Sequence, residues 1–183
     1  MAKRGVIVVD LQNEYLPTGK LPLSGIEAAA ANAARVIADA REKGIPIFHI
    51  RHEATSQTAP IFVPASTGAE IQAAVAPIAG EPVIVKHYIN AFRETDLKQQ
   101  LDAAGVQTLT VVGAMSHMCV DAVVRAAVDM GYPVTVLHDA CATLELRFGE
   151  VTVPAEHVHA ALMAAFVFGY GTVTSTEAYL AVA

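Results

Sequence analysis

A carboxylate, an amine and a thiol hold comparable places in this sequence. Asp10, Lys86 and Cys119 each follow a short apolar, β-branched run, Cys119 after an intervening turn. In an open α/β sheet, ligands bind beyond the carboxyl ends of the strands, so side chains that follow parallel strands converge on one edge. The pattern therefore predicts one site that contains an acid, a cation and a nucleophile.

Cys119 is the candidate nucleophile, because the pattern places it at the start of a helix with one apolar face. The partial positive charge and free N–H groups of a helix N-terminus favour a thiolate, and they can bind the oxygen of a tetrahedral intermediate. Lys86, if adjacent, would lower the pKa of the thiol further. Asp10 could then carry a proton from the thiol to a leaving group. Each residue alone has an ordinary structural explanation, so the prediction rests on their joint placement.

The elements that must position these residues alternate between strands and helices. Apolar runs without polar alternation are typical of strands buried on both faces, and the segments between them repeat apolar residues at helical spacing. This predicts one α/β domain over residues 1–183, with a mainly parallel six-stranded sheet and helices on both faces. Residues 53–67 and 144–153 are expected to be loops that shape the site. The predicted strands are residues 6–9, 45–50, 83–85, 109–112, 134–137 and 172–174, and the predicted helices are residues 26–43, 94–104, 119–130 and 154–168.

Composition argues against several classes of function. The net charge is −6 without a basic cluster, so nucleic acid and anionic membranes are poor partners. No apolar run reaches the roughly 18 residues of a membrane span, and no signal peptide or nucleotide-binding glycine motif is found. We expect a cytoplasmic protein with two free thiols. The 54% apolar content favours a homo-oligomer that buries residues 144–153 and 160–168 between subunits.

Longer motifs around the three residues resemble the isochorismatase-like hydrolases, which include nicotinamidases and N-carbamoylsarcosine amidases. The resemblance covers nearly the whole chain. It implies a three-layer Rossmann-like fold and hydrolysis of a C–N bond through a thioester. Cys119 would be the nucleophile, Asp10 the general acid and base, and Lys86 the activating cation. The motifs are Val-Val-Asp-Leu-Gln-Asn at 8–13, Val-Ile-Val-Lys at 83–86 with Ala91-Phe92 and Thr95-Asp96-Leu97 after it, and Val-Val-Gly-Ala-Met-Ser-His-Met-Cys-Val at 111–120.

The resemblance also carries finer expectations. It implies a cis peptide bond between Ala114 and Met115, so that the N–H groups of Met115 and Cys119 form an oxyanion hole. True isochorismatases, which cleave a vinyl ether, lack the cysteine, and this favours a small amide or carbamoyl compound as the substrate. Many relatives have threonine where this chain keeps a hydroxyl in Ser116.

No metal or cofactor is expected. Metal-binding relatives carry an Asp-x-His-x-x-x-x-x-His pattern after the second strand, and this chain does not. A metal or substrate role for His49 and His52 stays open. His49 is expected in or beside the strand, with Arg51 and His52 at the mouth of the pocket.

Other assignments follow from proximity to the strand ends. Cys141 is expected to be an inert core residue, and His157 and His159 to be surface or packing residues. Two alternatives remain, a hydrolase of another bond type and a non-enzymatic domain that uses Cys119 as a redox sensor. The candidate substrate-binding residues are Gln12, Tyr15, Asn90, Phe92 and His117.

Overall fold

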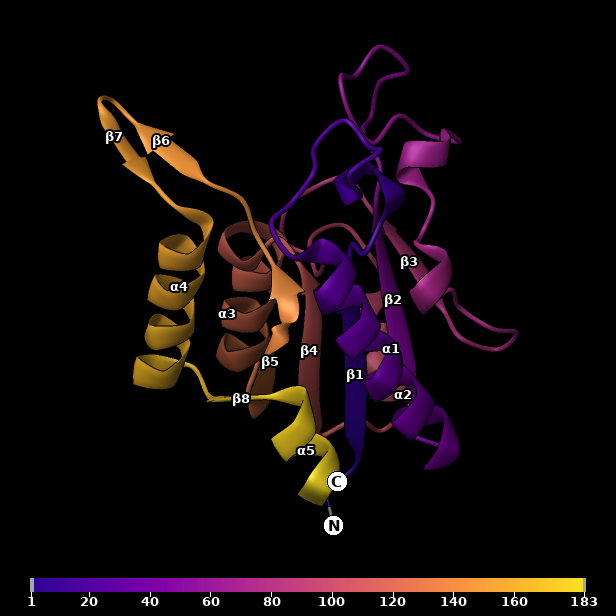
Figure 1. Cartoon of the computed structure of the whole chain (residues 1–183). Coiled ribbons are helices and arrows are strands. Elements are labelled where there is room, and N and C mark those ends of the chain that lie inside the picture. The colour runs from indigo at the N-terminus through magenta and orange to yellow at the C-terminus, as the bar shows by residue number, and fades with distance from the viewer. Residues whose placement is uncertain (1, 183) are drawn as a thin grey trace.

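One parallel sheet organises the chain. The structure is a computed structural model that describes residues 2–182, and the strand order is β3-β2-β1-β4-β5-β8 (Figure 1). All neighbouring pairs are parallel, so the predicted six-stranded sheet is confirmed. The strands are β1 (Arg4–Val9), β2 (Ile47–His52), β3 (Val83–Lys86), β4 (Thr108–Ala114), β5 (Val134–Ala142) and β8 (Thr172–Thr174).

Helices cover both faces of the sheet and give the three layers (Figure 1). Alternate side chains of a strand point to opposite faces, so Val6 and Val8 pack on one side of β1 while Ile7 and Val9 pack on the other. The first side holds α1 (Ile26–Glu42) and α5 (Thr176–Val182), and the second holds α2 (Leu97–Ala103), α3 (Asp121–Asp129) and α4 (Ala155–Gly169). None of the helices formed by residues 2–182 is long and apolar enough to cross a membrane.

Helix α1 shows why the predicted helices form. Its buried residues Ala29, Ala33, Val36 and Ala40 recur at intervals of three or four and make one apolar face. The helix stops just before Gly44, whose positive φ of 65° suits the turn after a helix. The short 3-10 turns η1 (Asn13–Tyr15), η2 (Thr67–Ala69) and η3 (Ala73–Val75) lie in the connections.

Several predicted elements differ from the structure, and strand β5, predicted over residues 134–137, runs on to Ala142. Helix α2 begins at Leu97 rather than residue 94, since Glu94 has a left-handed φ of 55° that no helix accommodates. Cys119 lies in a single π-helical turn, Ser116–Val120, that precedes α3. Residues 144–153 are an antiparallel hairpin of β6 (Leu146–Phe148) and β7 (Val151–Val153) rather than a loop.

Candidate active site

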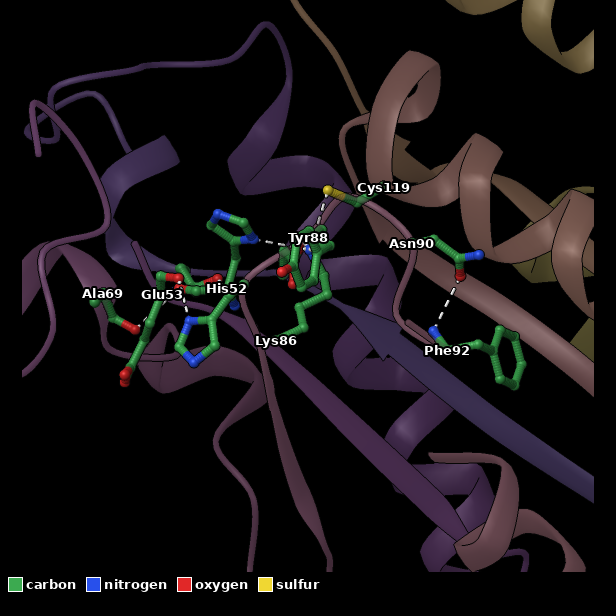
Figure 2. Close-up of polar contacts among 11 residues, drawn as sticks. His52, Glu53, Ala69, Lys86, Tyr88, Asn90, Phe92 and Cys119 are labelled. Carbon is green, nitrogen blue, oxygen red and sulfur yellow. Dashed lines mark hydrogen bonds and ion pairs between the residues drawn. The ribbon is translucent and has the colours of Figure 1, made fainter. Parts of the chain in front are cut away.

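The predicted catalytic residues meet at the point where the strand order reverses. Asp10 follows β1, and Cys119 follows its neighbour β4, whereas Lys86 ends β3, two strands from β1. Neighbouring strands lie about 4.8 Å apart, so only a long side chain can reach Asp10 from β3. Lys86 does so by passing His52, its partner in the β2–β3 register (Figure 2).

Lys86 is the centre of the cluster. Its Nζ lies 2.7 Å from Oδ2 of Asp10 and 3.2 Å from Sγ of Cys119. It also lies 3.1 Å from Nδ1 of His52 and 3.1 Å from the carbonyl oxygen of Tyr88. An ammonium group has three N–H donors, so these four neighbours share them. The side chains of Asp10 and Lys86 are both fully buried, so the strength of their ion pair depends strongly on its geometry.

Burial governs the protonation of the nucleophile. Burial and the nearby charge of Asp10 raise the pKa of the Cys119 thiol far above its ordinary value, and the Lys86 cation only partly opposes them. Lys86 lowers the thiol pKa as expected, but burial and Asp10 outweigh it, so the net pKa shift in the resting site is upward. Burial lowers the pKa of Lys86, but the charges of Asp10 and Cys119 outweigh it, so the net shift is upward and the amine stays protonated.

Asp10 keeps unused acceptor capacity. Apart from its ion pair with Lys86, neither carboxylate oxygen accepts a hydrogen bond of good geometry from residues 2–182. Its backbone has a left-handed φ of 48°, a conformation that aspartate tolerates better than most residues. A buried carboxylate with free lone pairs beside a thiol is suited to receive the thiol proton.

The backbone before Cys119 holds the nucleophile close to Asp10. Gly113 has a φ of 133°, and a Cβ added there would lie 2.1 Å from the carbonyl oxygen of Val9, so only glycine permits this approach of β4 to β1. The peptide bond between Ala114 and Met115 is cis, as the resemblance implies. The π-helical turn then bonds the N–H of Val120 to the carbonyl oxygen of Met115 at 3.2 Å.

A cavity of about 300 Å³ opens beside the cluster. Its lining residues are apolar or aromatic, and only Cys119, Tyr15 and His52 carry a polar side-chain atom or sulfur that could take part in chemistry. Phe62 packs edge-to-face against both rings, at centroid distances of 5.2 Å from Tyr15 and 5.3 Å from His52. The nucleophile is therefore presented to a small space with largely apolar walls.

Comparison with known proteins identifies the relatives of this fold and site. A family model described as Isochorismatase domain matches residues 4–178. The chain belongs to the isochorismatase family. It is 48% identical over 175 residues to the uncharacterized isochorismatase family protein YddQ of Bacillus subtilis, with 96% of this chain and 97% of that one covered.

Two further relatives extend the comparison. A crystal structure from Oleispira antarctica, assigned to the isochorismatase hydrolases, is similar with a TM-score of 0.95 and 49% identity, covering 98% of this chain and 96% of that chain. The chain is also 30% identical over 151 residues to a maleamate amidohydrolase of Pseudomonas putida, with 75% and 71% covered. The protein is a hydrolase of the isochorismatase family.

Of the predicted substrate-binding residues, Tyr15 lines the cavity and Gln12 does not. The Gln12 side chain is fully buried and occupied by the backbone. Its Nε2 donates to the carbonyl oxygens of His52 at 2.8 Å and Ala69 at 2.7 Å, while its Oε1 accepts from the N–H of His52 at 2.8 Å. In this isochorismatase-family protein, Gln12 fixes the end of β2, and its predicted contact with a substrate stays a prediction.

Asn90, Phe92 and His117 also lie outside the cavity lining. Oδ1 of Asn90 accepts a hydrogen bond from the N–H of Phe92 at 3.0 Å, and the Phe92 ring packs on the core (Figure 2). Nδ1 of His117 lies 2.6 Å from Oγ1 of Thr143, which turns its ring toward the end of β5. None of the three lines this cavity, because proximity in sequence to a strand end does not fix side-chain direction, and their roles in substrate binding stay predictions.

Two structural supports of the cavity were missed. Glu14 is buried, and its carboxylate accepts hydrogen bonds from the N–H groups of Lys20 at 3.1 Å and Phe62 at 3.3 Å. It thereby holds Phe62 against the cavity. The contact of His52 with Lys86 was also missed, although His52 ends β2 and the strand-end rule that selected Lys86 applies to it equally.

The remaining polar residues serve the framework. The Ser116 hydroxyl lies 2.9 Å from Nδ1 of His159, so this helical histidine packs against the loop before Cys119. Nε2 of His49 lies 3.0 Å from Oε2 of Glu81. Residues 2–182 contain no group of three or more His, Cys, Asp or Glu side chains placed to hold a metal ion. Metal independence stays a prediction.

Proposed function

We propose that this protein is a cysteine hydrolase that cleaves a C–N bond of a small amide or carbamoyl compound through a thioester on Cys119. One observation carries the proposal. The amine of Lys86 contacts both the buried carboxylate of Asp10, which has unused lone pairs, and the thiol of Cys119, which lines a small cavity.

The first half-reaction would use Asp10 as a base and then as an acid. Asp10 takes the proton from Cys119 as the sulfur attacks the carbonyl carbon, while Lys86 stabilises the developing thiolate. The N–H groups of Met115 and Cys119 are the proposed donors to the oxygen of the tetrahedral intermediate. Asp10 then returns the proton to the leaving nitrogen, and ammonia or an amine departs from the thioester.

The second half-reaction would repeat the cycle with water. Asp10 removes a proton from a water molecule, which attacks the thioester carbon. Collapse of the second tetrahedral intermediate expels the sulfur, and Asp10 returns the proton to it. The carboxylic or carbamic acid leaves, and the site is restored.

The redox-sensor alternative fits the site less well. A sensor thiol is accessible to solvent and has a low pKa, whereas Cys119 is 4% exposed and burial raises its pKa. A sensor also has no use for a buried carboxylate beside the thiol. Hydrolysis uses all three groups, and a cytoplasmic location, which keeps both free cysteines reduced, fits this proposal.

A screen of small primary amides and carbamoyl compounds for ammonia release tests the proposal. Wild-type protein and Cys141→Ala should both release ammonia from at least one compound, and Cys119→Ala should not. Activity should persist after exhaustive chelation, since no metal takes part in the steps. Ammonia release by Cys119→Ala at the wild-type rate would refute the proposal.

We also propose that the protein is a homo-oligomer. The β6–β7 hairpin projects from the body of the molecule, and its Phe148 is 89% exposed (Figure 1). Phe168, near the end of α4, is 95% exposed. Large exposed aromatic side chains on a projecting arm and its adjoining helix favour burial between subunits.

A further inference from the structure

We infer that the substrate carries an uncharged, apolar group beside its scissile C–N bond, and that the cavity rejects substrates with a carboxylate at that place. The inference rests on the proposed hydrolase function and specifies its substrate class. Its basis is the charge of every group that faces the cavity.

The lining residues supply apolar surface and no formal charge. Leu21, Ile61, Ile89 and Met118 form the walls together with the aromatic ring of Phe62, and the cavity lining contains no Asp, Glu, Lys or Arg. A ligand group inserted there loses its water, and the walls replace that water with van der Waals contacts alone. Such an exchange favours alkyl groups and strongly disfavours an unpaired ion.

His52 is the one lining residue that could become cationic, and its surroundings keep it neutral. Burial, reinforced by the charge of Lys86, lowers its pKa. Its Nδ1 lies 3.1 Å from the protonated Nζ of Lys86, so Nδ1 accepts a hydrogen bond and the ring proton resides on Nε2. His52 therefore brings a neutral ring with one N–H donor, on Nε2, to the cavity lining. The hydrogen bonds between the Gln12 side chain and the His52 backbone fix the position of that N–H donor.

The other polar group in the lining is neutral as well. Burial, followed in effect by the nearby charge of Asp10, raises the pKa of Tyr15 well above its usual value. Tyr15 and His52 can orient the carbonyl or amide end of a substrate, but neither can neutralise an anion. Tyr15 and His52 thus suit the amide end of a substrate, and the apolar walls would contact the rest of the ligand.

The cation beside the nucleophile is already paired. Lys86 contacts Sγ of Cys119 and is engaged by Asp10 at 2.7 Å. Arg51 and Arg93 lie outside the cavity lining, Arg51 at 2.8 Å from the carboxylate of Glu53 and Arg93 stacked on the Tyr88 ring. A substrate carboxylate would have to displace one of these contacts, whereas an alkyl group requires no rearrangement.

Two amides of equal shape test the inference. Succinamate and 4-methylpentanamide differ by a carboxylate in place of an isopropyl group of similar size. The wild-type protein should cleave 4-methylpentanamide with a kcat/KM at least roughly 100-fold higher, measured as ammonia release. Binding of both compounds to Cys119→Ala, measured by saturation-transfer NMR, should show the same preference.

The two measurements separate this inference from the proposed function. Selective binding of 4-methylpentanamide without ammonia release would support the apolar site and refute the hydrolysis of such amides. Equal or better binding or cleavage of succinamate would overturn the inference, and so would failure of both compounds to bind.

A charged variant sharpens the test. Ile89→Lys places a cation at the mouth of the cavity, where the side chain is 40% exposed, and should raise the succinamate to 4-methylpentanamide ratio of kcat/KM by about tenfold. Ile78→Lys is the matched control, because Ile78 is 54% exposed and lies outside the cavity lining. It should leave the ratio unchanged. An equal change in both variants would assign the effect to net charge and contradict the inference.

Discussion

Two clusters of charged side chains lie toward opposite ends of the sheet and treat their carboxylates differently. Toward the amino end, Glu81 accepts hydrogen bonds from Arg41 at 2.8 and 2.9 Å and from the N–H of Ile78 at 3.0 Å, and lies 3.0 Å from Nε2 of His49. At the carboxyl end, Asp10 has its ion pair with Lys86 and accepts no hydrogen bond of good geometry from residues 2–182. Glu81 is saturated with donors, and Asp10 is not.

The difference separates a structural carboxylate from a reactive one. The Arg41 hydrogen bonds lead the contacts that lower the pKa of Glu81 to about 2, so Glu81 stays ionised and holds the segment before β3 to α1. A depression of about 630 Å³ adjoins this cluster, but the described residues that line it include no Cys, Ser, Thr or Lys. The larger cavity therefore contains none of the predicted catalytic residues, whereas the unsatisfied carboxylate of Asp10 belongs to the site of the proposed nucleophile.

The largest expected effect separates Asp10 from Glu81 by activity. Asp10→Asn keeps the size of the side chain but removes its ability to accept and return a proton, so turnover should fall by about 10²–10⁴-fold. Glu81→Gln should leave turnover within about twofold of wild type, because Glu81 lies outside the cavity lining. Steady-state ammonia release checks both.

The charge of Asp10 makes this prediction specific. Because Asp10 raises the pKa of Cys119, removing its charge favours the thiolate. A loss of turnover in Asp10→Asn would therefore reflect lost proton transfer rather than lost thiolate. Wild-type turnover in a folded Asp10→Asn protein would break the distinction between the two carboxylates.

The second effect is on stability, and here the larger loss is expected from the change at Glu81 rather than at Asp10. Glu81→Gln weakens hydrogen bonds to Arg41 and His49, so the free energy of unfolding at pH 7 should drop by about 1–3 kcal/mol. Since the folded state lowers the pKa of Glu81 from 4.5 to about 2, its contribution is complete above pH 4.5 and is lost as the pH falls toward 2. Urea titrations across this range should show a flatter pH dependence for Glu81→Gln. If the free energy of unfolding of Glu81→Gln depended on pH as steeply as that of wild type, Glu81 would not be the group that causes this pH dependence.

The sequence predicted which strand ends meet better than it predicted the walls of the cavity. Asp10, Lys86 and Cys119 come together because backbone topology alone brings strand ends together. Gln12, Asn90 and His117 do not line the cavity, because rotamers and local hydrogen bonds decide where a side chain points, and no periodicity encodes them. The net pKa shift of Cys119 was predicted in the wrong direction, because burial and the charge of Asp10 outweigh the effect of Lys86.

The two cysteines give a third, smaller contrast. Burial, with a smaller contribution from the charge of Asp139, raises the pKa of Cys141 to about 12, and burial raises the pKa of Cys119 as well. Lys86 lies 3.2 Å from Sγ of Cys119 and can stabilise its thiolate as it attacks, so iodoacetamide should alkylate Cys119 at least about tenfold faster at neutral pH. Peptide mapping after partial labelling measures both rates. Preferential labelling of Cys141 would count against Cys119 as the activated thiol.

The smallest effect on catalysis is expected at the exposed aromatic residues. Phe148→Ser combined with Phe168→Ser removes apolar surface outside the active site, so sedimentation should shift from an oligomer toward a monomer while turnover stays within about twofold. A wild-type protein that sediments as a monomer at micromolar concentration would contradict the proposed assembly.

The most direct test of the account is the intact mass of the protein during turnover of the best amide from the screen. Acid quenching in the first turnovers should trap a mass increase equal to the acyl group, with the nitrogen lost, and peptide mapping should place it on Cys119. Cys119→Ala should show neither the adduct nor ammonia release. Two results together would contradict the account. The wild-type protein would release ammonia without an adduct on Cys119, and Cys119→Ala would release ammonia at an undiminished rate.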